Sequence, residues 1–333
     1  MKAIFFNPGK VSPEITEVAI PVIGENEVLV KVKASALNHR DLHITNANNK
    51  KGFIYGSDGA GVISEVGKNV TQWSVGDEVV INSQISCLQC EYCLKGEHSL
   101  CESGSVLGGG AWAGTFAEYV KIPASNLELK PRHLTFEEAA ALPLALGTAW
   151  RVLFTKAKLQ PGESILIEGI GGGVALYCLQ LAKSVGAKVY VTSSSNEKID
   201  KAVKLGAVAG INYLSREDDR FSLEPRGFDV ILSSNGKSLG SSIQYARKGA
   251  RLVQFSFLGE ELARFNVDVV MGKQLEILGS AMHSYSEFKE AMRFVGLSKL
   301  VPIVSKVLPL ESYRDGFMEM KQGNQFGKIV FSI

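Results

Sequence analysis

Residues 164–175, Ser-Ile-Leu-Ile-Glu-Gly-Ile-Gly-Gly-Gly-Val-Ala, decide the fold of this chain. An apolar strand over residues 164–168 runs into a glycine-rich turn, and a helix over residues 176–184 follows. Glycines allow backbone amides to approach a pyrophosphate, and the helix N-terminus offers unpaired N–H groups and a favourable dipole. The turn has one residue more than the strict G-x-G-x-x-G spacing, and such turns also occur for close packing alone. In its strand–turn–helix context it predicts dinucleotide binding through Gly169, Gly171, Gly172, Gly173 and Val174.

Strands and helical stretches alternate through the second half of the chain. This alternation is typical of a parallel, doubly wound sheet, and therefore of an α/β fold. The expected strands are residues 164–168, 188–192, 210–213, 228–233 and 250–255. Just before this region, Thr135 followed three residues later by Glu138 forms a capping-box signature that starts a helix.

The first 125 residues have mostly β character and resemble an antiparallel barrel. Residues 27–34 alternate apolar and polar side chains, and residues 59–67, 75–82 and 114–123 add short segments with Gly and Asp turn signals. Near the C-terminus we expect a helix over residues 286–295 and a final strand after Phe326. If that strand pairs with the first half, the barrel domain comprises residues 1–125 and 283–333, and the dinucleotide domain comprises residues 126–282.

The segment Thr192-Ser-Ser-Ser-Asn-Glu-Lys follows the second predicted strand of the dinucleotide domain and bears on cofactor choice. An acidic side chain at the strand end would bind the ribose hydroxyls of NAD, but hydroxyls and then a lysine occupy this segment. Neutral donors with a cation suit a 2′-phosphate, which favours NADP(H) bound by Ser193, Ser194, Ser195 and Lys198. One alternative is a polar turn that caps a helix from Asn196, and another is that Glu197 folds back toward the ribose.

Four of the five cysteines lie within residues 87–101. Four thiolates so close in sequence can converge on one tetrahedral ion, which predicts a closed, structural zinc site at Cys87, Cys90, Cys93 and Cys101. Disulfides or free thiols are the alternatives. The N-terminus carries no signal-peptide pattern, so an oxidising compartment is not implied. Cys178 lies in an apolar helical pattern and is expected to be a small core residue.

Composition is that of an ordinary globular enzyme. The 333 residues suffice for two domains, with 45% hydrophobic and 21% charged residues. A net charge of +2 without a basic block argues against a nucleic-acid surface. The apolar run over residues 139–150 is short and broken by Pro143 and Gly147, which argues against a membrane span. We therefore expect a cytoplasmic protein that acts on a small molecule.

The closed cysteine loop, the barrel half and the glycine turn, in this order, resemble the medium-chain dehydrogenase/reductase superfamily over nearly the whole chain. Further stretches that match the motifs of this superfamily are residues 37–42, 56–62, 142–150, 205–207 and 326–330. The closest resemblance is to the quinone oxidoreductase-like and YogA-type branch. It implies a GroES-like domain plus a Rossmann domain, an active site in the cleft between them, and a homodimer joined edge to edge near residues 250–257.

In the alcohol dehydrogenases of this superfamily, a catalytic zinc is bound by Cys, by His followed by an acid, and by a third Cys or acidic residue. The matching positions hold Asn38, Ser57 followed by Asp58, and a residue near Leu144. Amide, hydroxyl and hydrocarbon side chains do not replace thiolate and imidazole as zinc ligands. The chain therefore resembles a member that keeps the structural zinc but lacks the catalytic zinc, whereas its branch usually lacks both.

Without a Lewis acid, alcohol oxidation loses the metal that stabilises an alkoxide, while hydride transfer to an activated C=C or C=O group remains feasible. The sequence therefore predicts an enzyme, an NADPH-dependent reductase of quinones, enones or reactive carbonyls. One alternative is an alcohol dehydrogenase with a different zinc site that uses His39 or His43. Another is a non-catalytic NADPH-binding sensor or RNA-binding module.

Several residues are candidates for the catalytic site. The resemblance implies that Thr148 packs beside the nicotinamide, with a hydroxyl bonded to the preceding helical turn as the alternative. Asn38 is expected to bind the ribose or the substrate oxygen, or else to fix the loop that carries Asp41. Arg40 or Tyr55 is expected to donate to a developing enolate oxygen.

The sequence also gives an alternative role for Arg40 and two further candidates in the dinucleotide domain. Arg40 has an alternative role in a structural ion pair with Asp41 or Asp58. At the ends of the later strands, the resemblance implies that Asn235 and Phe255 contact the nicotinamide ribose and carboxamide.

Overall fold

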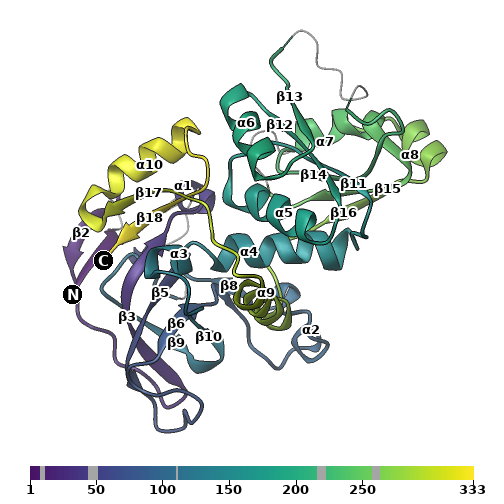
Figure 1. Ribbon diagram of the computed structural model, residues 1–333. Coiled ribbons are helices and arrows are strands. Elements are labelled where there is room, and N and C mark those ends of the chain that lie inside the picture. The colour runs from purple at the N-terminus through teal and green to yellow at the C-terminus, as the bar shows by residue number, and fades with distance from the viewer. Residues whose placement is uncertain (8–11, 44–51, 110–111, 216–222, 257–262) are drawn as a thin grey trace. The chain divides into compact units, whose positions relative to one another are not determined.

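The computed structural model describes the chain except for residues 8–11, 44–51, 110–111, 216–222 and 257–262 (Figure 1). The chain divides into two compact units. Unit 1 comprises Met1–Gly147 and His283–Ile333, and unit 2 comprises Thr148–Met282. A search of the described helices finds none that is both long enough and apolar enough to cross a membrane.

Unit 1 is built on a seven-stranded sheet with the order β10-β6-β5-β3-β18-β17, in which β9 also pairs with β3. Smaller sheets have the orders β2-β1-β4 and β7-β8. The strands of this unit are β1 (Lys2–Phe6), β2 (Glu14–Glu17), β3 (Glu27–Ala36), β4 (Phe53–Ile54), β5 (Asp58–Val66), β6 (Glu78–Ile81), β7 (Gln84–Ile85), β8 (Ser105–Val106), β9 (Tyr119–Pro123), β10 (Leu127–Leu129), β17 (Val304–Pro309) and β18 (Lys328–Ser332).

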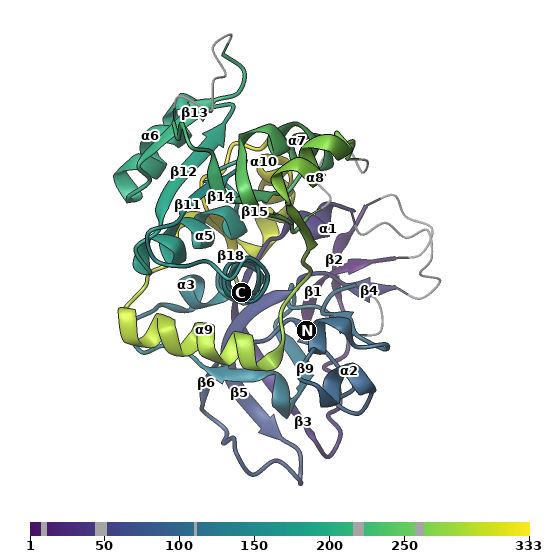
Figure 2. The same ribbon diagram turned by 90° about the vertical axis from the view of Figure 1, so that its right-hand side faces the viewer.

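Short helices connect these strands, and two longer ones lie in the C-terminal segment (Figure 2). They are α1 (His39–His43), α2 (Glu91–Leu94), α3 (Phe136–Ala140), α4 (Pro143–Trp150), α9 (Tyr285–Ser298) and α10 (Tyr313–Gln322), with single 3₁₀ turns at His98–Leu100, Ala124–Asn126 and Leu310–Ser312. The predicted capping box is present: Thr135 Oγ1 accepts from the Glu138 N–H, and the Glu138 carboxylate accepts from the Thr135 N–H. Helix α4 contains the point at which the two units divide.

The alternating side chains of β3 supply much of the core of unit 1. Val28, Val30 and Val32 are essentially buried and belong to the same apolar cluster as residues of β5 and β6. Strand β5 approaches β3 closely because it carries Gly61, where a Cβ atom would lie 2.2 Å from the Lys31 carbonyl oxygen. The apolar–polar alternation in the sequence is matched by burial only around Lys31 and Lys33, because Leu29 and residues 34–36 are buried as well.

The C-terminal strand returns to the N-terminal half of the chain. β18 pairs antiparallel with β3, with Phe331 opposite Ser35, so the sheet of unit 1 is completed from both ends of the sequence. Residues 126–147 also lie in unit 1, although the sequence placed the boundary at residue 126. The reason is packing: β10 pairs with β6, and α3 contacts β3 and β5.

Unit 2 is a parallel sheet with the strand order β13-β12-β11-β14-β15-β16. This order and the flanking helices confirm the predicted α/β class (Figure 2). The elements are β11 (Ser164–Ile167), α5 (Gly173–Ser184), β12 (Lys188–Ser193), α6 (Asn196–Leu205), β13 (Ala209–Asn212), β14 (Phe228–Ser233), α7 (Gly236–Ser242), β15 (Ala246–Gln254), α8 (Val267–Lys273) and β16 (Glu276–Gly279), preceded by a π-helical turn at Arg151–Lys156 and with a 3₁₀ turn at Ile243–Tyr245.

The free edge of this sheet is not where the sequence placed it. Strand β15 is paired with β14 on one side and with β16 on the other, so residues 250–254 have no open backbone edge. β16 is the last strand in the order. Of the segment expected to join two copies, Phe257 lies outside the described residues. An alternating strand signal does not reveal which strand ends a sheet, because strand order depends on pairing across the chain.

Candidate functional site

The four cysteines of residues 87–101 form a closed cluster in unit 1. Their sulfur atoms all lie within 4.8 Å of one another, and the Cys87 and Cys93 sulfurs are 3.9 Å apart. Tetrahedral zinc with Zn–S bonds of about 2.3 Å places its sulfurs about 3.8 Å apart, so the donor set fits zinc. All four are free thiols rather than disulfides. Within the described part of the chain, no second group of three or more His, Cys, Asp or Glu side chains gathers in this way.

Backbone N–H groups favour a thiolate at Cys87, the first cysteine of this loop, whereas burial raises the pKa of Cys93 to about 12. The N–H of Cys90 points at the Cys87 sulfur at 3.3 Å, and the N–H of Cys87 points at the Cys101 sulfur at 3.2 Å. N–H groups from Gln89 and Cys90 lower the pKa of Cys87 to about 6. Leu88 adopts a left-handed backbone with φ of 61°, which turns the chain between the first two cysteines.

The cysteine loop is fastened to the start of α9. The His98 ring stacks on Tyr285 with centroids 4.6 Å apart, and the Tyr285 N–H points at His98 Nδ1 at 3.4 Å. The Tyr285 hydroxyl donates to Asn126 Oδ1 at 2.8 Å and accepts from the Ser86 N–H at 3.3 Å. His98 is therefore a packing residue here, and the loop is held to unit 1 by side chains as well as by the cysteines.

The first prediction concerns metal content. We expect about one zinc per chain, as four thiolates close the coordination sphere. Cys93→Ser removes the most buried ligand and should lower the bound zinc to well under half of the wild-type amount, with a lower melting temperature. Elemental analysis after dialysis measures the metal. Cys178→Ala is the control, because Cys178 is fully buried in α5 and outside the cluster. Equal zinc in the wild type and in Cys93→Ser would contradict the assignment.

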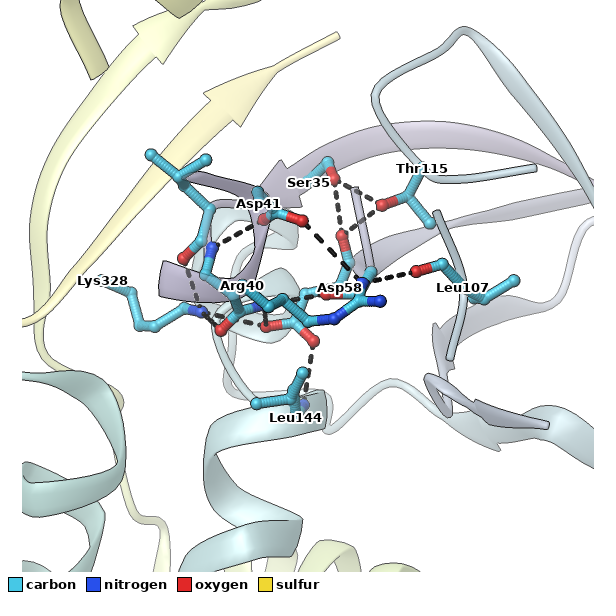
Figure 3. A network of polar contacts seen from close by, with 11 residues as sticks. Ser35, Arg40, Asp41, Asp58, Leu107, Thr115, Leu144 and Lys328 are labelled. Carbon is cyan, nitrogen blue, oxygen red and sulfur yellow. Dashed lines mark hydrogen bonds and ion pairs between the residues drawn. The ribbon is translucent and has the colours of Figure 1, made fainter. Parts of the chain in front are cut away.

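A second, entirely different polar cluster surrounds the Asp58 carboxylate (Figure 3). Asp58 begins β5 and is fully buried. Its Oδ2 accepts from Lys328 Nζ at 3.0 Å and from Asn38 Nδ2 at 2.9 Å, and its Oδ1 accepts from the Leu144 N–H at 2.8 Å. The Leu144 N–H belongs to the first turn of α4, where helical N–H groups otherwise lack partners.

The cluster brings together all three positions that match catalytic-zinc ligands. Asn38 Nδ2 donates to Ser57 Oγ at 3.0 Å as well as to Asp58, and Leu144 reaches Asp58 through its backbone. The amide orientation of Asn38 follows from chemistry, because its Oδ1 lies 2.5 Å from Lys328 Nζ, which only donates. The Asn38 side chain and N–H are thus occupied by hydrogen bonds within the cluster and to Asp41. This matches the alternative role given for Asn38, which is to fix the loop that carries Asp41.

Lys328 is the member of the cluster that the sequence analysis missed. Its side chain is 4% exposed, and its ammonium donates to the Leu37 carbonyl, to Asn38 and to Asp58. The signal was present: Lys328 opens a strand of buried apolar residues, and a lysine in such a strand requires a partner inside the protein. Asp58 therefore pairs with Lys328 and not with Arg40.

Arg40 lies on α1 at the side of this cluster. Its Nη1 donates to the Leu107 carbonyl at 2.8 Å and lies 3.9 Å from Asp41 Oδ1. Asp41 is fully buried and its Oδ2 accepts from the Asn38 N–H. Burial raises the pKa of Asp41 to about 6 despite the nearby Arg40, so this carboxyl is mostly ionised at neutral pH.

Two other candidates are less available than the sequence suggested. Tyr55 is 3% exposed and packs among Phe6, Phe53 and Phe317, and burial raises its pKa to about 12. Burial, with Lys328 nearby, lowers the pKa of His39 to about 4, which leaves it uncharged at neutral pH.

The second prediction concerns Lys328. Lys328→Met leaves the buried Asp58 carboxylate without its cation, so the free energy of unfolding should fall by about 3–5 kcal/mol. The double variant Lys328→Met/Asp58→Asn removes both charges and should recover most of that loss. Urea and thermal unfolding measure the effect. Lys306 on neighbouring β17 makes an exposed pair with Glu319 of α10. Lys306→Met breaks this pair and should lower the free energy of unfolding by under about 1 kcal/mol. Equal losses for the two single variants would refute the buried pair.

In unit 2, the glycine turn connects β11 to α5 as predicted. Gly169 and Gly171 have φ of 74° and 136°, conformations that favour glycine. Gly172 precedes α5, no side chain caps the helix there, and nothing lies within 4 Å of where its Cβ would be. The first N–H groups of a twelve-residue helix thus have no side-chain cap, which suits a phosphate. Gly173 and Val174 form the first turn of that helix.

The segment after β12 is arranged around a helix cap. Ser195 caps α6, since its side chain accepts from the Lys198 N–H at 3.4 Å, and Ser193 Oγ accepts from the Ser195 N–H at 3.1 Å. The cap is therefore Ser195 and not Asn196. Glu197 pairs with Lys201 at 2.6 Å on the exposed face of α6. Ser194 is exposed, and burial lowers the pKa of Lys198.

The remaining predicted residues, Asn235, Phe255 and Thr148, all belong to unit 2. Asn235 and Phe255 follow β14 and β15, and the Phe255 N–H donates to the Ser233 carbonyl at 3.1 Å. Because neighbouring parallel strands end at one edge, these residues share the carboxyl edge of the sheet with the glycine turn. Thr148 is 4% exposed within α4.

Comparisons with known proteins agree with this architecture. Residues 24–132 match the model of the alcohol dehydrogenase GroES-like domain, and residues 173–296 match that of the zinc-binding dehydrogenase family. A zinc-type alcohol dehydrogenase-like protein of Schizosaccharomyces pombe is 33% identical, over 93% of this chain and 92% of its own length. The zinc-type alcohol dehydrogenase-like protein YogA of Leptosphaeria maculans is 31% identical, over 96% and 94%.

Two further relatives carry more specific names. The acryloyl-coenzyme A reductase of Sulfurisphaera tokodaii is 28% identical, over 99% of both chains. A solved structure of an NAD-dependent alcohol dehydrogenase superposes with a TM-score of 0.93 and 36% identity, covering 100% of both chains.

A GroES-like β unit with a closed cysteine cluster, followed by a Rossmann-like unit, defines a two-domain oxidoreductase for which a nicotinamide cofactor is expected. The chain belongs to the zinc-type alcohol dehydrogenase-like proteins of the medium-chain dehydrogenase/reductase superfamily.

Proposed function

We propose that this protein is an NADPH-dependent reductase that transfers hydride to a quinone, an enone or a reactive carbonyl without a catalytic metal. The observation that carries the proposal is the Asp58 cluster. The positions that match zinc ligands hold an amide, a hydroxyl and a leucine, and the Asn38 amide oxygen is bound to the Lys328 ammonium.

The cluster disfavours a divalent ion for two physical reasons. Its donors are not those of a catalytic zinc site, which uses thiolate, imidazole or carboxylate. Moreover, Oδ2 of Asp58, the carboxylate of this cluster, already accepts from the Lys328 ammonium and the Asn38 amide. A divalent ion would have to displace Lys328, a buried monocation held by three acceptors.

The nicotinamide cofactor supplies the hydride, so a site without a metal remains compatible with reduction of polarised double bonds. In unit 2 the uncapped N-terminus of α5 would hold the pyrophosphate, and the glycines of the turn would allow its close approach. Ser193, Ser194, Ser195 and Lys198 would surround a 2′-phosphate. The ion pair of Glu197 with Lys201 supports this choice, because that acidic side chain is occupied away from a ribose site.

Names among the relatives support two chemistries. The acryloyl-coenzyme A reductase favours reduction of a C=C bond conjugated to a carbonyl, whereas several relatives are named alcohol dehydrogenases. The Asp58 cluster favours the first chemistry, because alcohol oxidation in this superfamily relies on a metal-stabilised alkoxide.

The third prediction tests the reaction. Purified protein with NADPH should reduce 1,4-naphthoquinone or 2-cyclohexenone, measured as loss of absorbance at the NADPH band. Activity should persist after treatment with a zinc chelator that removes any loosely held ion, because no metal takes part in the step. Oxidation of ethanol or 2-butanol that depends on a second zinc per chain would overturn the proposal. Tight NADPH binding with no turnover of any quinone, enone or aldehyde would favour a sensor.

The same assay resolves the cofactor. Lys198→Ala should reduce kcat/KM for NADPH by about tenfold or more and leave that for NADH nearly unchanged, because a charge-assisted contact to phosphate is lost. Lys201→Ala, one turn further along α6 and paired with Glu197, serves as the control. A wild-type preference for NADH would refute the NADP(H) assignment.

We also propose that two copies pair through β16 to form a homodimer. β16 ends the sheet of unit 2, and its Ile277 is 38% exposed, while Val267 and Met271 on nearby α8 are 73% and 70% exposed. An open strand edge beside exposed apolar side chains suits pairing with a second chain.

The fourth prediction follows from this edge. Light scattering after size exclusion should give a dimer for the wild type and a larger monomer fraction for Ile277→Lys, whose charge opposes burial. Val307→Lys is the matched control on β17, the edge strand of the unit 1 sheet, where the side chain is 48% exposed. A monomeric wild type, or dissociation by the control alone, would contradict the assignment.

A further inference from the structure

Arg40 carries hydrogen-bond donors that no described residue accepts from. Only Nη1 donates within the described residues, to the Leu107 carbonyl at 2.8 Å (Figure 3). Asp41 Oδ1 lies 3.9 Å from that nitrogen, beyond hydrogen-bonding distance. A guanidinium has five N–H donors, and among the described residues those of Nε and Nη2 meet no acceptor. The side chain is 23% exposed, which makes it mostly enclosed yet accessible.

The guanidinium has a contact on each side. The Leu107 carbonyl fixes one side of the fork, and Gly109 lies against the other. A Cβ atom at residue 109 would meet Arg40 Nη2 at 2.3 Å, a distance that no real contact permits. An alanine at 109 would therefore push the end of the Arg40 side chain away from its present position, whereas the φ of residue 109 does not itself demand glycine.

Charges around Arg40 are balanced. Lys328 offsets Asp58 at 3.0 Å, and Arg40 offsets Asp41, while the neighbouring His39 is uncharged at neutral pH. Two cations and two carboxylates sum to zero, so the cluster gives little attraction to a substrate that already carries a negative charge. A preorganised donor in a neutral site suits an oxygen that becomes negative during the reaction.

We propose that Arg40 is the catalytic hydrogen-bond donor to the carbonyl oxygen of an uncharged enone or quinone, and that Gly109 is a positioning residue for it. This rests on the reductase function proposed above. Tyr55, the other candidate, is 3% exposed in an aromatic cluster and offers no comparable access.

The role of Arg40 follows from the electron flow. Hydride addition from the reduced nicotinamide, which would be left as NADP+, forms a C–H bond at the β carbon of an enone. The C=C pair then becomes a double bond between the α carbon and the carbonyl carbon, and the C=O π pair moves onto oxygen, giving an enolate. Arg40 keeps its protons and stabilises that oxygen by hydrogen bonding. The α carbon then takes a proton from solvent water, which completes the saturated ketone.

The fifth prediction uses three variants and two readouts. Arg40→Gln and Gly109→Ala should each lower kcat by about 100-fold, the effect of removing one donor to an oxyanion. Arg40→Lys keeps the charge but loses the planar guanidinium, so its kcat should lie between that of these two variants and that of the wild type. The second readout needs no turnover: infrared difference spectra of bound 2-cyclohexenone should show a carbonyl stretch lowered in the wild type and restored in Arg40→Gln and Gly109→Ala.

A matched control separates this role from a merely structural one. Arg251 also donates to a backbone carbonyl, that of Ala157, and pairs with Glu163. It lies toward the amino end of β11, away from the glycine turn at the other end of that strand. Arg251→Gln should lower the melting temperature but leave kcat and the carbonyl stretch unchanged. Gly109→Ala retains the arginine, so a folding defect of Arg40→Gln does not remove the test.

The outcomes are distinct. An unshifted carbonyl in the wild type, or a shift that survives in both Arg40→Gln and Gly109→Ala, overturns the assignment of Arg40. A better kcat/KM for carboxylate-bearing enones than for neutral ones overturns the proposed substrate charge. If the carbonyl shift depends on Arg40 and no substrate turns over with NADPH, the donor role stands and the reductase function fails.

Discussion

The buried Asp58 carboxylate is the constraint on which unit 1 depends. A charge inside a protein must be paired and fully hydrogen-bonded, and Asp58 obtains its partners from distant parts of the chain. Lys328 comes from the C-terminal strand, Asn38 from the segment after β3, and the Leu144 N–H from the first turn of α4. The backbone carbonyl of the same residue accepts from the Ser35 and Thr115 hydroxyls (Figure 3). One residue thus joins both ends of the barrel to the helix that leads into unit 2.

The same pairing explains why two polar clusters in one unit differ in chemistry. The cysteine loop offers four soft ligands at sulfur–sulfur separations that suit tetrahedral zinc, and it is closed, so it shapes the loop without presenting an open metal position. The Asp58 cluster balances its carboxylate with an ammonium instead of a metal ion. Under the proposed function its stability and its reactivity are linked, because the lysine that pairs with the buried carboxylate also occupies the oxygen that a metal would need.

Local features of this fold were predictable and long-range ones were not. The glycine turn, the Thr135 capping box and the alternation in β3 are signals within a few residues, and the structure contains the turn, the cap and the strand that they predict. The Lys328–Asp58 pair spans 270 positions, so no periodicity reveals it. Strand order has the same character: residues 250–254 have the composition of a strand, but only the pairing with β16 shows that they are interior to the sheet. For the site, chemistry-bearing residues were identifiable, whereas the commitment of Asn38 to Lys328 required the fold.

Lys328 and Arg40 show why charge alone does not locate a reactive group. Both are cations beside a buried carboxylate, but the three protons of the Lys328 ammonium all go to acceptors of the protein, and its side chain is 4% exposed. Arg40 donates to the Leu107 carbonyl, and its other N–H groups meet no acceptor in the described part of the chain, with Gly109 beside its Nη2. The first arrangement lowers the energy of the resting protein. The second leaves donors whose interaction strengthens only when a negative oxygen forms, which is the property that distinguishes stabilisation of a transition state from stabilisation of a fold.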